Sequence, residues 1–251
     1  MRNAFYGLIL ALQFLTRIPV PLRCPWRADT CRWALRCYPL VGLLIGSLLA
    51  AVAELGQALP TPFLALTLLS VWVVLSGGLH LDGVMDVADA LGSNASLETR
   101  WAIIKDSQVG SFAILSLVFL LAWKGMLLWA LLTAGATPAW LVALPALARF
   151  GALSLLRLAP CARREGLAWT WRQHLTRNDL VLSLVPLVPL FVWLPVGIGL
   201  LAALLVFLSL YGLVMVRAFT GINGDIVGAA IEGGELWLLL SAWSWWWFVT
   251  G

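Results

Sequence analysis

The chain has 251 residues, of which 62% are hydrophobic and only 11% are charged, and its formal net charge is +4. An ordinary soluble domain carries about 25% charged residues. This composition, with a mean hydropathy of +0.95, therefore excludes a soluble globular protein. The apolar runs are continuous rather than alternating, and a bilayer admits only helices or closed barrels. We therefore predict an all-α, polytopic membrane bundle.

The first predicted element is a short apolar helix over residues 3–16, too short to span upright and expected to lie at the interface or to re-enter. About seven spanning helices follow, in a single domain over residues 1–251. Pro186 and Pro189 could break the fifth span or make it re-entrant. The predicted spans are 38–57, 61–81, 109–132, 138–158, 179–194, 196–218 and 226–249.

The connections between these spans differ in charge. Strict alternation of the spans places the four charged connections on one side, and these are residues 17–37, 82–108, 159–178 and 219–225. The opposite connections contain no charge and lie near 58–60, 133–137 and 194–195. Since an excess of Lys and Arg marks the cytoplasmic side, we expect a multi-pass protein of the cytoplasmic (inner) membrane, with its polar segments in the cytosol.

The segment 80–89 is the most informative motif, because it follows an apolar run directly and carries three aspartates. Asp82, Asp86 and Asp89 occupy positions i, i+4 and i+7, within about 60° of one another on a helix. Like charges this close repel unless a cation or a proton lies among them, and carboxylates suit Mg²⁺. A solvated polar face with Asp82 as a helix cap is the alternative. His80 is a candidate metal ligand or base, or a hydrogen-bonded structural residue.

A second acidic cluster begins the last predicted span. Asp225 and Glu232 are i and i+7, and Glu235 lies one turn further, inside an apolar run. Ionisable residues at such positions are costly and are candidates for function, although a carboxyl that braces two helices is the alternative. The five candidate metal ligands, enough for two Mg²⁺ ions that bridge a pyrophosphate, are Asp82, Asp86, Asp89, Asp225 and Glu232.

Several further polar residues are candidates for substrate binding. Lys124 and Arg149 lie in the middle of apolar spans, where they either pair with Glu232 or Glu235 or face a cavity for phosphate. Arg164 belongs to an Arg-Arg-Glu-Gly-Leu stretch, and guanidinium groups bind phosphate through two parallel hydrogen bonds. Asp106 and Ser107 precede a span, either as helix caps or as site residues.

These residues together predict a Mg²⁺-dependent phosphoryl-group transferase with a cytosolic site. A CDP-alcohol phosphatidyltransferase is the nearest alternative, but its pattern requires Ala where Asp86 stands. A membrane transporter that uses the carboxylates is a second alternative, and it would favour charged connections on both faces.

The ordered motifs resemble those of the cobalamin synthase family, the adenosylcobinamide-GDP ribazoletransferases, over nearly the whole chain. Val84-Met85 and Ile222-Asn223 depart from the family pattern. The matching blocks are Phe14-Leu15-Thr16-Arg17-Ile18-Pro19-Val20-Pro21, Tyr38-Pro39-Leu40-Val41-Gly42, Gly78-Leu79-His80-Leu81-Asp82-Gly83 with Asp86 and Asp89, Asp106-Ser107 with Gly110, Arg164-Glu165-Gly166-Leu167, and Gly224-Asp225 with Gly228, Ala229 and Glu232.

The resemblance implies a reaction in which a hydroxyl of α-ribazole, or of its 5′-phosphate, attacks the cobinamide-linked phosphate of adenosylcobinamide-GDP and GMP leaves. It implies Mg²⁺ as cofactor, with Asp82, Asp86 and Asp225 as ligands and Asp89 or Glu232 as ligand or general base. Membrane lipids are expected partners and nucleic acid is not. A homo-oligomer or a complex with other corrinoid-pathway enzymes stays open.

Overall fold

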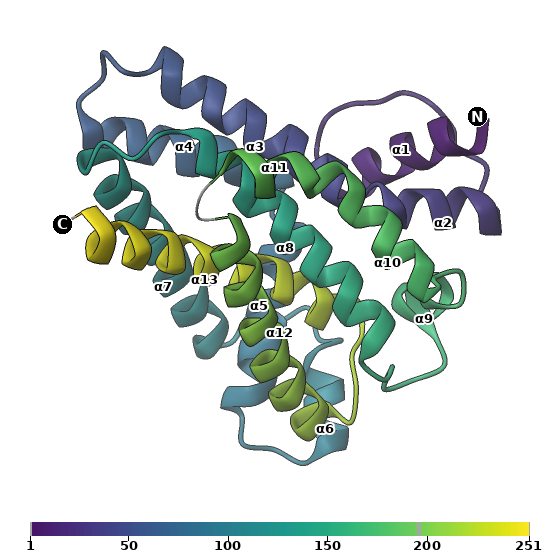
Figure 1. Cartoon of the computed structure of the whole chain (residues 1–251). Helices are drawn as coiled ribbons and strands as arrows, with labels where there is room; N and C mark the ends of the chain where they lie inside the picture. Colours follow the sequence, from purple (N-terminus) through teal and green to yellow (C-terminus); the bar gives the residue numbers. More distant parts are fainter. Residues whose placement is uncertain (1, 195–196, 251) are drawn as a thin grey trace.

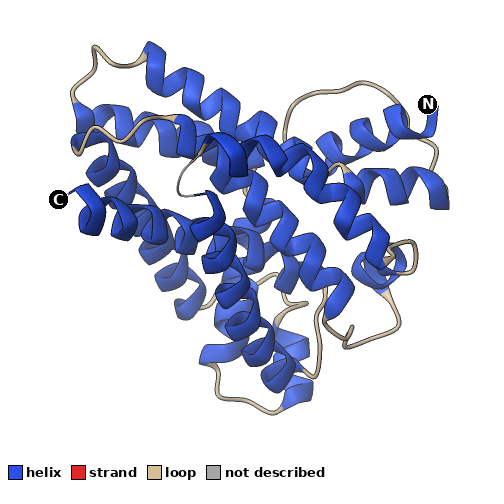
Figure 2. Ribbon diagram, viewed as in Figure 1, coloured by secondary structure: helices blue, strands red, loops and turns tan. Residues whose placement is uncertain are grey.

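The computed structural model describes residues 2–194 and 197–250. The first residue of the span predicted over 196–218 and part of the connection predicted at 194–195 therefore lie outside the described residues. Every long regular element within the described ranges is a helix, which confirms the predicted all-α class (Figures 1 and 2).

The helices follow the predicted order, with additional short helices in the predicted connections. They are α1 (Arg2–Leu15), α2 (Ala28–Arg36), α3 (Tyr38–Leu55), α4 (Thr61–Ser76), α5 (Leu79–Gly92), α6 (Leu97–Ile103), α7 (Ser111–Thr133), α8 (Ala139–Leu158), α9 (Gly166–Arg172), α10 (Arg177–Leu184), η1 (Val185–Leu187), α11 (Val188–Trp193), α12 (Gly197–Phe219) and α13 (Gly224–Thr250).

Five of the described helices are long and apolar enough to cross a membrane, namely α3, α7, α8, α12 and α13. Two bent helix pairs, α4 with α5 and α9 with α10–α11, raise the number of spans to as many as seven if each pair is one span. The upper number agrees with the seven spans predicted from the sequence.

The prediction of one continuous helix over 61–81 is wrong. Gly77 and Gly78 have φ of 70° and 72°, a left-handed conformation that glycine adopts without the steric cost of a Cβ. The chain therefore turns by 90° between α4 and α5. This turn places the three aspartates on a separate helix that runs across the end of α4.

The predicted span 179–194 is also not one straight helix. The described chain divides it into α10, the 3-10 turn η1 and α11, with Pro186 in η1 and Pro189 in α11. The missing N–H of proline interrupts the helical hydrogen bonds at this point. Residues 17–37, predicted as a connection, contain the helix α2, whose Arg32 and Arg36 bind the buried carboxylate of Asp179 on α10.

The centre of the bundle is α8, in which nearly every side chain from Trp140 to Leu156 is buried (Figure 1). α3 packs closely against it, because Gly42 and Gly46 are one turn apart and a Cβ at either position would collide with the backbone of α8. Small residues at this spacing let membrane helices approach each other. α13 packs against α5, α7, α8 and α12.

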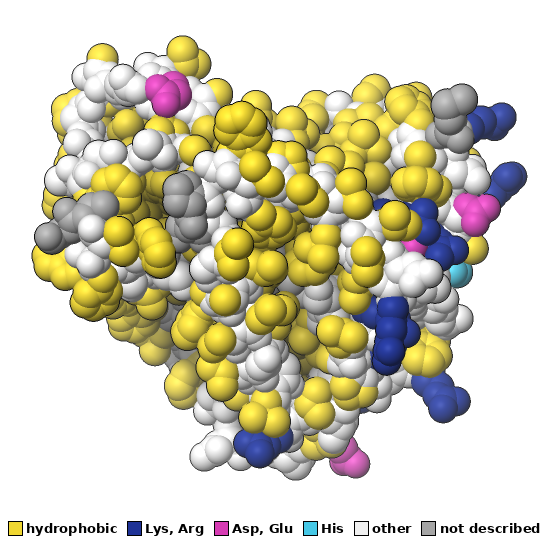
Figure 3. All heavy atoms as spheres, viewed as in Figure 1, with side chains coloured by type: hydrophobic (Ala, Val, Ile, Leu, Met, Phe, Trp, Pro, Cys, Tyr) yellow, Lys and Arg dark blue, Asp and Glu magenta, His cyan; other side chains and the backbone are white. Residues whose placement is uncertain are grey.

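The charged side chains are as unevenly distributed on the surface as they are among the connections of the sequence. Hydrophobic side chains cover most of the face in Figure 3, whereas Lys and Arg side chains gather at its right and lower edges, over the ends of the helices. The charged loops and the start of α13 lie toward this end of the bundle in Figure 1.

Candidate functional site

The structure places the first acidic cluster beside the start of α13. At Gly83 the two helices touch, because a Cβ there would lie 2.6 Å from the carbonyl oxygen of Asp225. The carboxylates of Asp82 and Asp225 both act electrostatically on Asp86. We call Asp82, Asp86 and Asp225 the acidic trio.

The acidic trio has almost no partners in the protein. Asp82 is exposed and Asp86 is half-buried, and within the described residues neither forms a hydrogen bond or an ion pair. Asp225 accepts one hydrogen bond, from Asn223 Nδ2 at 2.7 Å. The N-cap of α5 is Gly78, with no side-chain cap, so helix capping does not account for Asp82. Among the described residues, no ion pair offsets the repulsion within the trio.

The donor set of the trio fits a hard divalent cation. Mg²⁺ is usually bound through one or two carboxylates, with water and substrate phosphates completing its octahedron. In the described ranges, no group of three or more His, Cys, Asp or Glu side chains is arranged so that it could hold a metal ion. A cation held here would accordingly depend on water and on phosphate oxygens for its other ligands.

Asp89 faces the neighbouring helix α7. Its Oδ2 accepts from the N–H of Gly110 at 2.6 Å, and its Oδ1 accepts from the N–H of Ala113 at 2.8 Å. These N–H groups belong to the first turn of α7, where helices lack internal acceptors and favour negative charge. Asp89 is thereby a cap for α7, although it also lines the acidic cavity with Asp82 and Asp86, and its role as ligand or general base stays a prediction.

Glu232 lies on the same face of α13 as Asp225, but about 10 Å further along the axis. It is buried, and its Oε2 accepts from Lys124 Nζ at 2.5 Å. Lys124 Nζ also donates to Glu235 Oε2 at 2.7 Å, and Arg149 Nη1 donates to Glu235 Oε1. We call these four residues the buried charge network.

This network bears on residues for which the sequence left two alternatives open. Lys124 and Arg149 are 2% and 0% exposed, and their cationic groups are paired with glutamates rather than directed at a substrate. Glu232 is paired with Lys124 as well and lines none of the three cavities described below, so its role as a metal ligand or general base stays a prediction. Of the alternatives left open, the structure favours helix bracing, since the network joins α7, α8 and α13.

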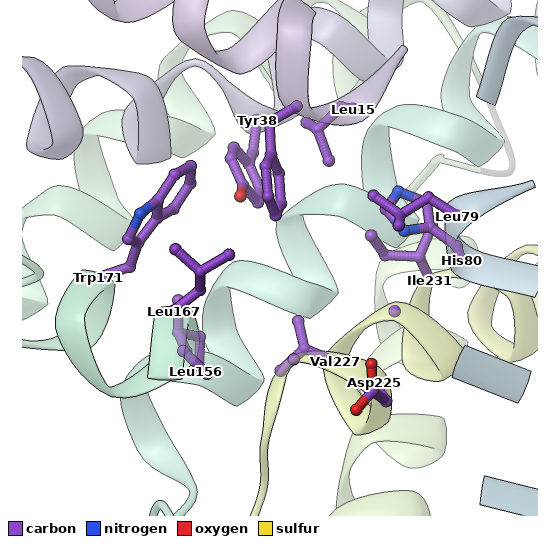
Figure 4. A pocket seen from close by; sticks show the side chains of 14 residues that line it. Leu15, Tyr38, Leu79, His80, Leu156, Leu167, Trp171, Asp225, Val227 and Ile231 are labelled. Carbon is purple, nitrogen blue, oxygen red and sulfur yellow. The ribbon is translucent and has the colours of Figure 1, made fainter. Parts of the chain in front are cut away.

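His80 lies between the trio and the buried charge network. The residue is 4% exposed, packs against Gly228 of α13, and experiences the charges of Arg149, Glu235 and Lys124. Its Nε2 is buried without a hydrogen-bond partner among the described residues. Its ring lines a cavity that also contains Asp225 (Figure 4).

Three cavities adjoin the acidic trio. The apolar cavity, of about 180 Å³, includes Tyr38, His80, Trp171 and Asp225 in its lining. The loop cavity, of about 420 Å³, also borders Asp225 and is lined by Trp101, Lys105, Arg163, Trp169 and Asn223 among others. The acidic cavity, of about 310 Å³, contains Asp82, Asp86, Asp89, Lys105, Asp106 and Ser107. Asp225 lines both the apolar and the loop cavity, and Lys105 lines both the loop and the acidic cavity, so the three cavities are neighbours.

The predicted substrate residues are distributed unequally around this region. Asp106 and Ser107 are exposed beside the acidic cavity, and Arg163 rather than Arg164 lines the loop cavity. Sequence reasoning gave Lys105 no role of its own and missed Trp101. Asn223, a departure from the family pattern, accepts from the N–H of Ile226 at 2.9 Å as the cap of α13 while it orients Asp225. The Asn-Gly-Asp sequence before an apolar helix is the signal that could have indicated this cap.

Comparisons with known proteins agree with this arrangement of motifs. Residues 7–243 match the family model for cobalamin-5-phosphate synthase. The chain is similar to the adenosylcobinamide-GDP ribazoletransferase of Geobacillus thermodenitrificans, with 39% identity over 96% of this chain and 99% of the relative. The relative with the same name from Halalkalibacterium halodurans is 36% identical over the full length of both chains. The one from Pseudomonas paraeruginosa is 40% identical over 96% of this chain and 99% of the relative. No solved structure matches.

Proposed function

From the premise that the chain belongs to the cobalamin-5-phosphate synthase family, we propose that it is an adenosylcobinamide-GDP ribazoletransferase of the cytoplasmic membrane. A ribose hydroxyl of α-ribazole, or of its 5′-phosphate, attacks the phosphorus atom that bears the cobinamide. The bond from that phosphorus to the oxygen of GMP breaks, GMP leaves with the bonding electrons, and the hydroxyl proton passes to a base. Because the chain belongs to this family, we prefer this function to that of a CDP-alcohol phosphatidyltransferase or a membrane transporter.

The observation that carries this proposal is that the acidic trio lies among three neighbouring cavities. Two substrates must approach one phosphorus atom from different directions, and Asp225 borders two of these cavities. The loop cavity, which is the larger of the two and contains two tryptophans and two cationic side chains, suits the nucleoside diphosphate part of the donor.

The acidic trio would hold Mg²⁺ together with the diphosphate of the donor. A bound Mg²⁺ supplies charge that offsets the negative charge developing on the leaving phosphate. The protein's own contribution is positional. Gly83 allows α5 and α13 to touch, and Asn223 holds the Asp225 carboxylate at the helix start. Lys105 and Arg163 add positive charge beside the diphosphate.

The test is release of GMP by membranes that carry the chain, supplied with adenosylcobinamide-GDP and α-ribazole, with Mg²⁺ or with EDTA. We expect Asp82→Asn to lower the rate by at least about 100-fold, because it removes one ligand charge from the metal site. Asp29→Asn is the matched control, since Asp29 is an exposed aspartate on α2 away from the three cavities. GMP release that survives EDTA, or an Asp82→Asn variant with full activity, would refute the metal role.

A further inference from the structure

The apolar cavity combines a buried aromatic floor with an exposed rim. Tyr38 and Trp171 are 4% and 2% exposed, and their ring centroids lie 5.9 Å apart with the planes inclined by 59°. Leu79 and Leu167, at the rim, are about half exposed. In Figure 4 the side chains of Tyr38, Leu156, Leu167, Trp171 and Ile231 surround an opening that leads toward Asp225.

Two nitrogen atoms on side chains that line this cavity lack partners among the described residues. Nε2 of His80 and Nε1 of Trp171 are buried without a hydrogen bond in the described part of the chain. A buried donor without an acceptor costs about 1–3 kcal/mol, and native proteins rarely leave such groups unpaired. An occupant that is apolar over most of its surface, but offers a nitrogen or oxygen acceptor to one of these nitrogens, would remove part of this cost.

The size of the cavity limits the occupant further. Pockets for drug-sized ligands measure about 300–1,000 Å³, so a cavity of about 180 Å³ accommodates a small ring system rather than a whole nucleotide. An acyl chain would fill the same apolar space, but it offers no acceptor to the His80 side chain. The lining therefore favours a flat heteroaromatic ring over a lipid tail.

We propose that the apolar cavity binds the dimethylbenzimidazole base of the acceptor nucleoside, and that His80 donates a hydrogen bond to the free ring nitrogen of that base. The inference rests on the proposed function. With the base in this cavity, the attached ribose emerges at the rim beside Asp225, where its hydroxyl meets the donor phosphate. His80 is in this account a binding residue that selects the acceptor, not a metal ligand or a base.

The first test compares two acceptors in steady-state kinetics. One is α-ribazole, and the other is its dimethylindole analogue, in which a C–H group replaces the free ring nitrogen. In the wild-type protein we expect the KM of the analogue to be about 10-fold higher or more, because His80 loses its acceptor. In the His80→Phe variant the two acceptors should have nearly equal KM values, while the KM of adenosylcobinamide-GDP changes by no more than about twofold.

A second variant keeps the inference testable if His80→Phe does not fold. Leu79→Trp enlarges a half-exposed side chain at the rim that lines neither the loop cavity nor the acidic cavity, and we expect it to raise the KM of α-ribazole at least about 10-fold without changing the donor KM. Leu158→Trp is the control, because Leu158 is 64% exposed and lines none of the three cavities.

Each outcome separates this inference from the function on which it rests. Absence of GMP release by the wild-type protein would remove the proposed function itself. Normal turnover with no discrimination between the two acceptors, or discrimination that persists in His80→Phe, would overturn the assignment of the cavity alone. An acceptor KM that is unchanged in Leu79→Trp, with activity that depends on the lipid composition, would identify an acyl chain as the occupant.

Discussion

Asp86 and Asp89 are less than one turn apart on α5, yet their surroundings differ. Asp86 forms no hydrogen bond with any described residue, whereas both oxygens of Asp89 accept N–H groups from the first turn of α7. Their common stripe is readable from the sequence, because it depends only on helical spacing. Which of them faces α7 depends on how two helices pack, and spacing within one helix carries no information about this.

We predict that Asp89 and Asp82 respond differently to loss of charge. Asp89→Asn keeps an acceptor oxygen for the start of α7 and should retain a substantial fraction of GMP release, whereas Asp82→Asn should not. Asp89→Ala removes the cap and should lower stability by about 0.5–2 kcal/mol. GMP release measures the effect of the two Asn substitutions on activity, and thermal unfolding in detergent measures the effect of Asp89→Ala on stability. Loss of activity in Asp89→Asn equal to that in Asp82→Asn would show that Asp89 belongs with the trio.

The buried charge network leads to a prediction about stability. Glu235 contacts both Lys124 and Arg149, whereas Glu232 contacts Lys124 alone. Removing one partner of a buried ion pair leaves a charge uncompensated and costs about 3–5 kcal/mol. Glu235→Gln should therefore lower the apparent unfolding temperature in detergent more than Glu232→Gln does.

The control for this prediction is a double variant. Glu235→Gln combined with Arg149→Leu removes both charges of one pair, and its destabilisation should be smaller than the sum of the two single effects. Strictly additive losses would mean that the two side chains do not interact.

At the scale of elements, the approach of α5 to α13 depends on one glycine. A Cβ at Gly83 would lie 2.6 Å from the carbonyl oxygen of Asp225, and backbone at that distance must move. We predict that Gly83→Ala separates Asp82 and Asp86 from Asp225 and lowers GMP release by at least about 10-fold, since an error near 1 Å in position can cost about 100-fold. The insertion of the variant in membranes should be unchanged.

Gly199→Ala is the matched control for this substitution. Gly199 lies inside α12, and a Cβ there would meet nothing within 4 Å. Alanine favours a helix over glycine by about 1 kcal/mol, so this variant should be as active as the wild type and at least as stable. Equal activity of Gly83→Ala and Gly199→Ala would show that the contact between α5 and α13 does not set the site.

The long apolar helices could be predicted from the sequence within a few residues, because a helix that spans a bilayer requires a continuous run of hydrophobic residues. The bend at Gly77 and Gly78 was missed, since an apolar run gives no sign of direction and only the Gly-Gly pair indicates a turn. α2 was missed because it is short and rich in arginine. Its arginines bind Asp179, about 145 residues further along the chain, and such a pairing cannot be read from local pattern.

At the scale of the whole molecule, the charged loops and the acidic trio should share one side of the membrane. Lys and Arg gather at one end of the bundle (Figure 3), and an excess of these residues stays in the cytoplasm. Exposed Gln108 lies in the loop beside the acidic cavity, and exposed Gln57 lies in the turn after α3. We predict that these two positions face opposite sides.

Single-cysteine labelling measures this topology. In a background without the native thiols at Cys24, Cys31, Cys37 and Cys161, Gln108→Cys should react with an impermeant maleimide in inverted vesicles, and Gln57→Cys only in right-side-out vesicles. Each variant is kept only if it still releases GMP, so that the labelled chain is a folded one. Since the proposed substrates are charged and water-soluble, a site on the cytosolic side needs no path across the bilayer. Labelling of Gln108→Cys in right-side-out vesicles would place the acidic trio on the side of the membrane opposite to its substrates, and this result would contradict the proposed function.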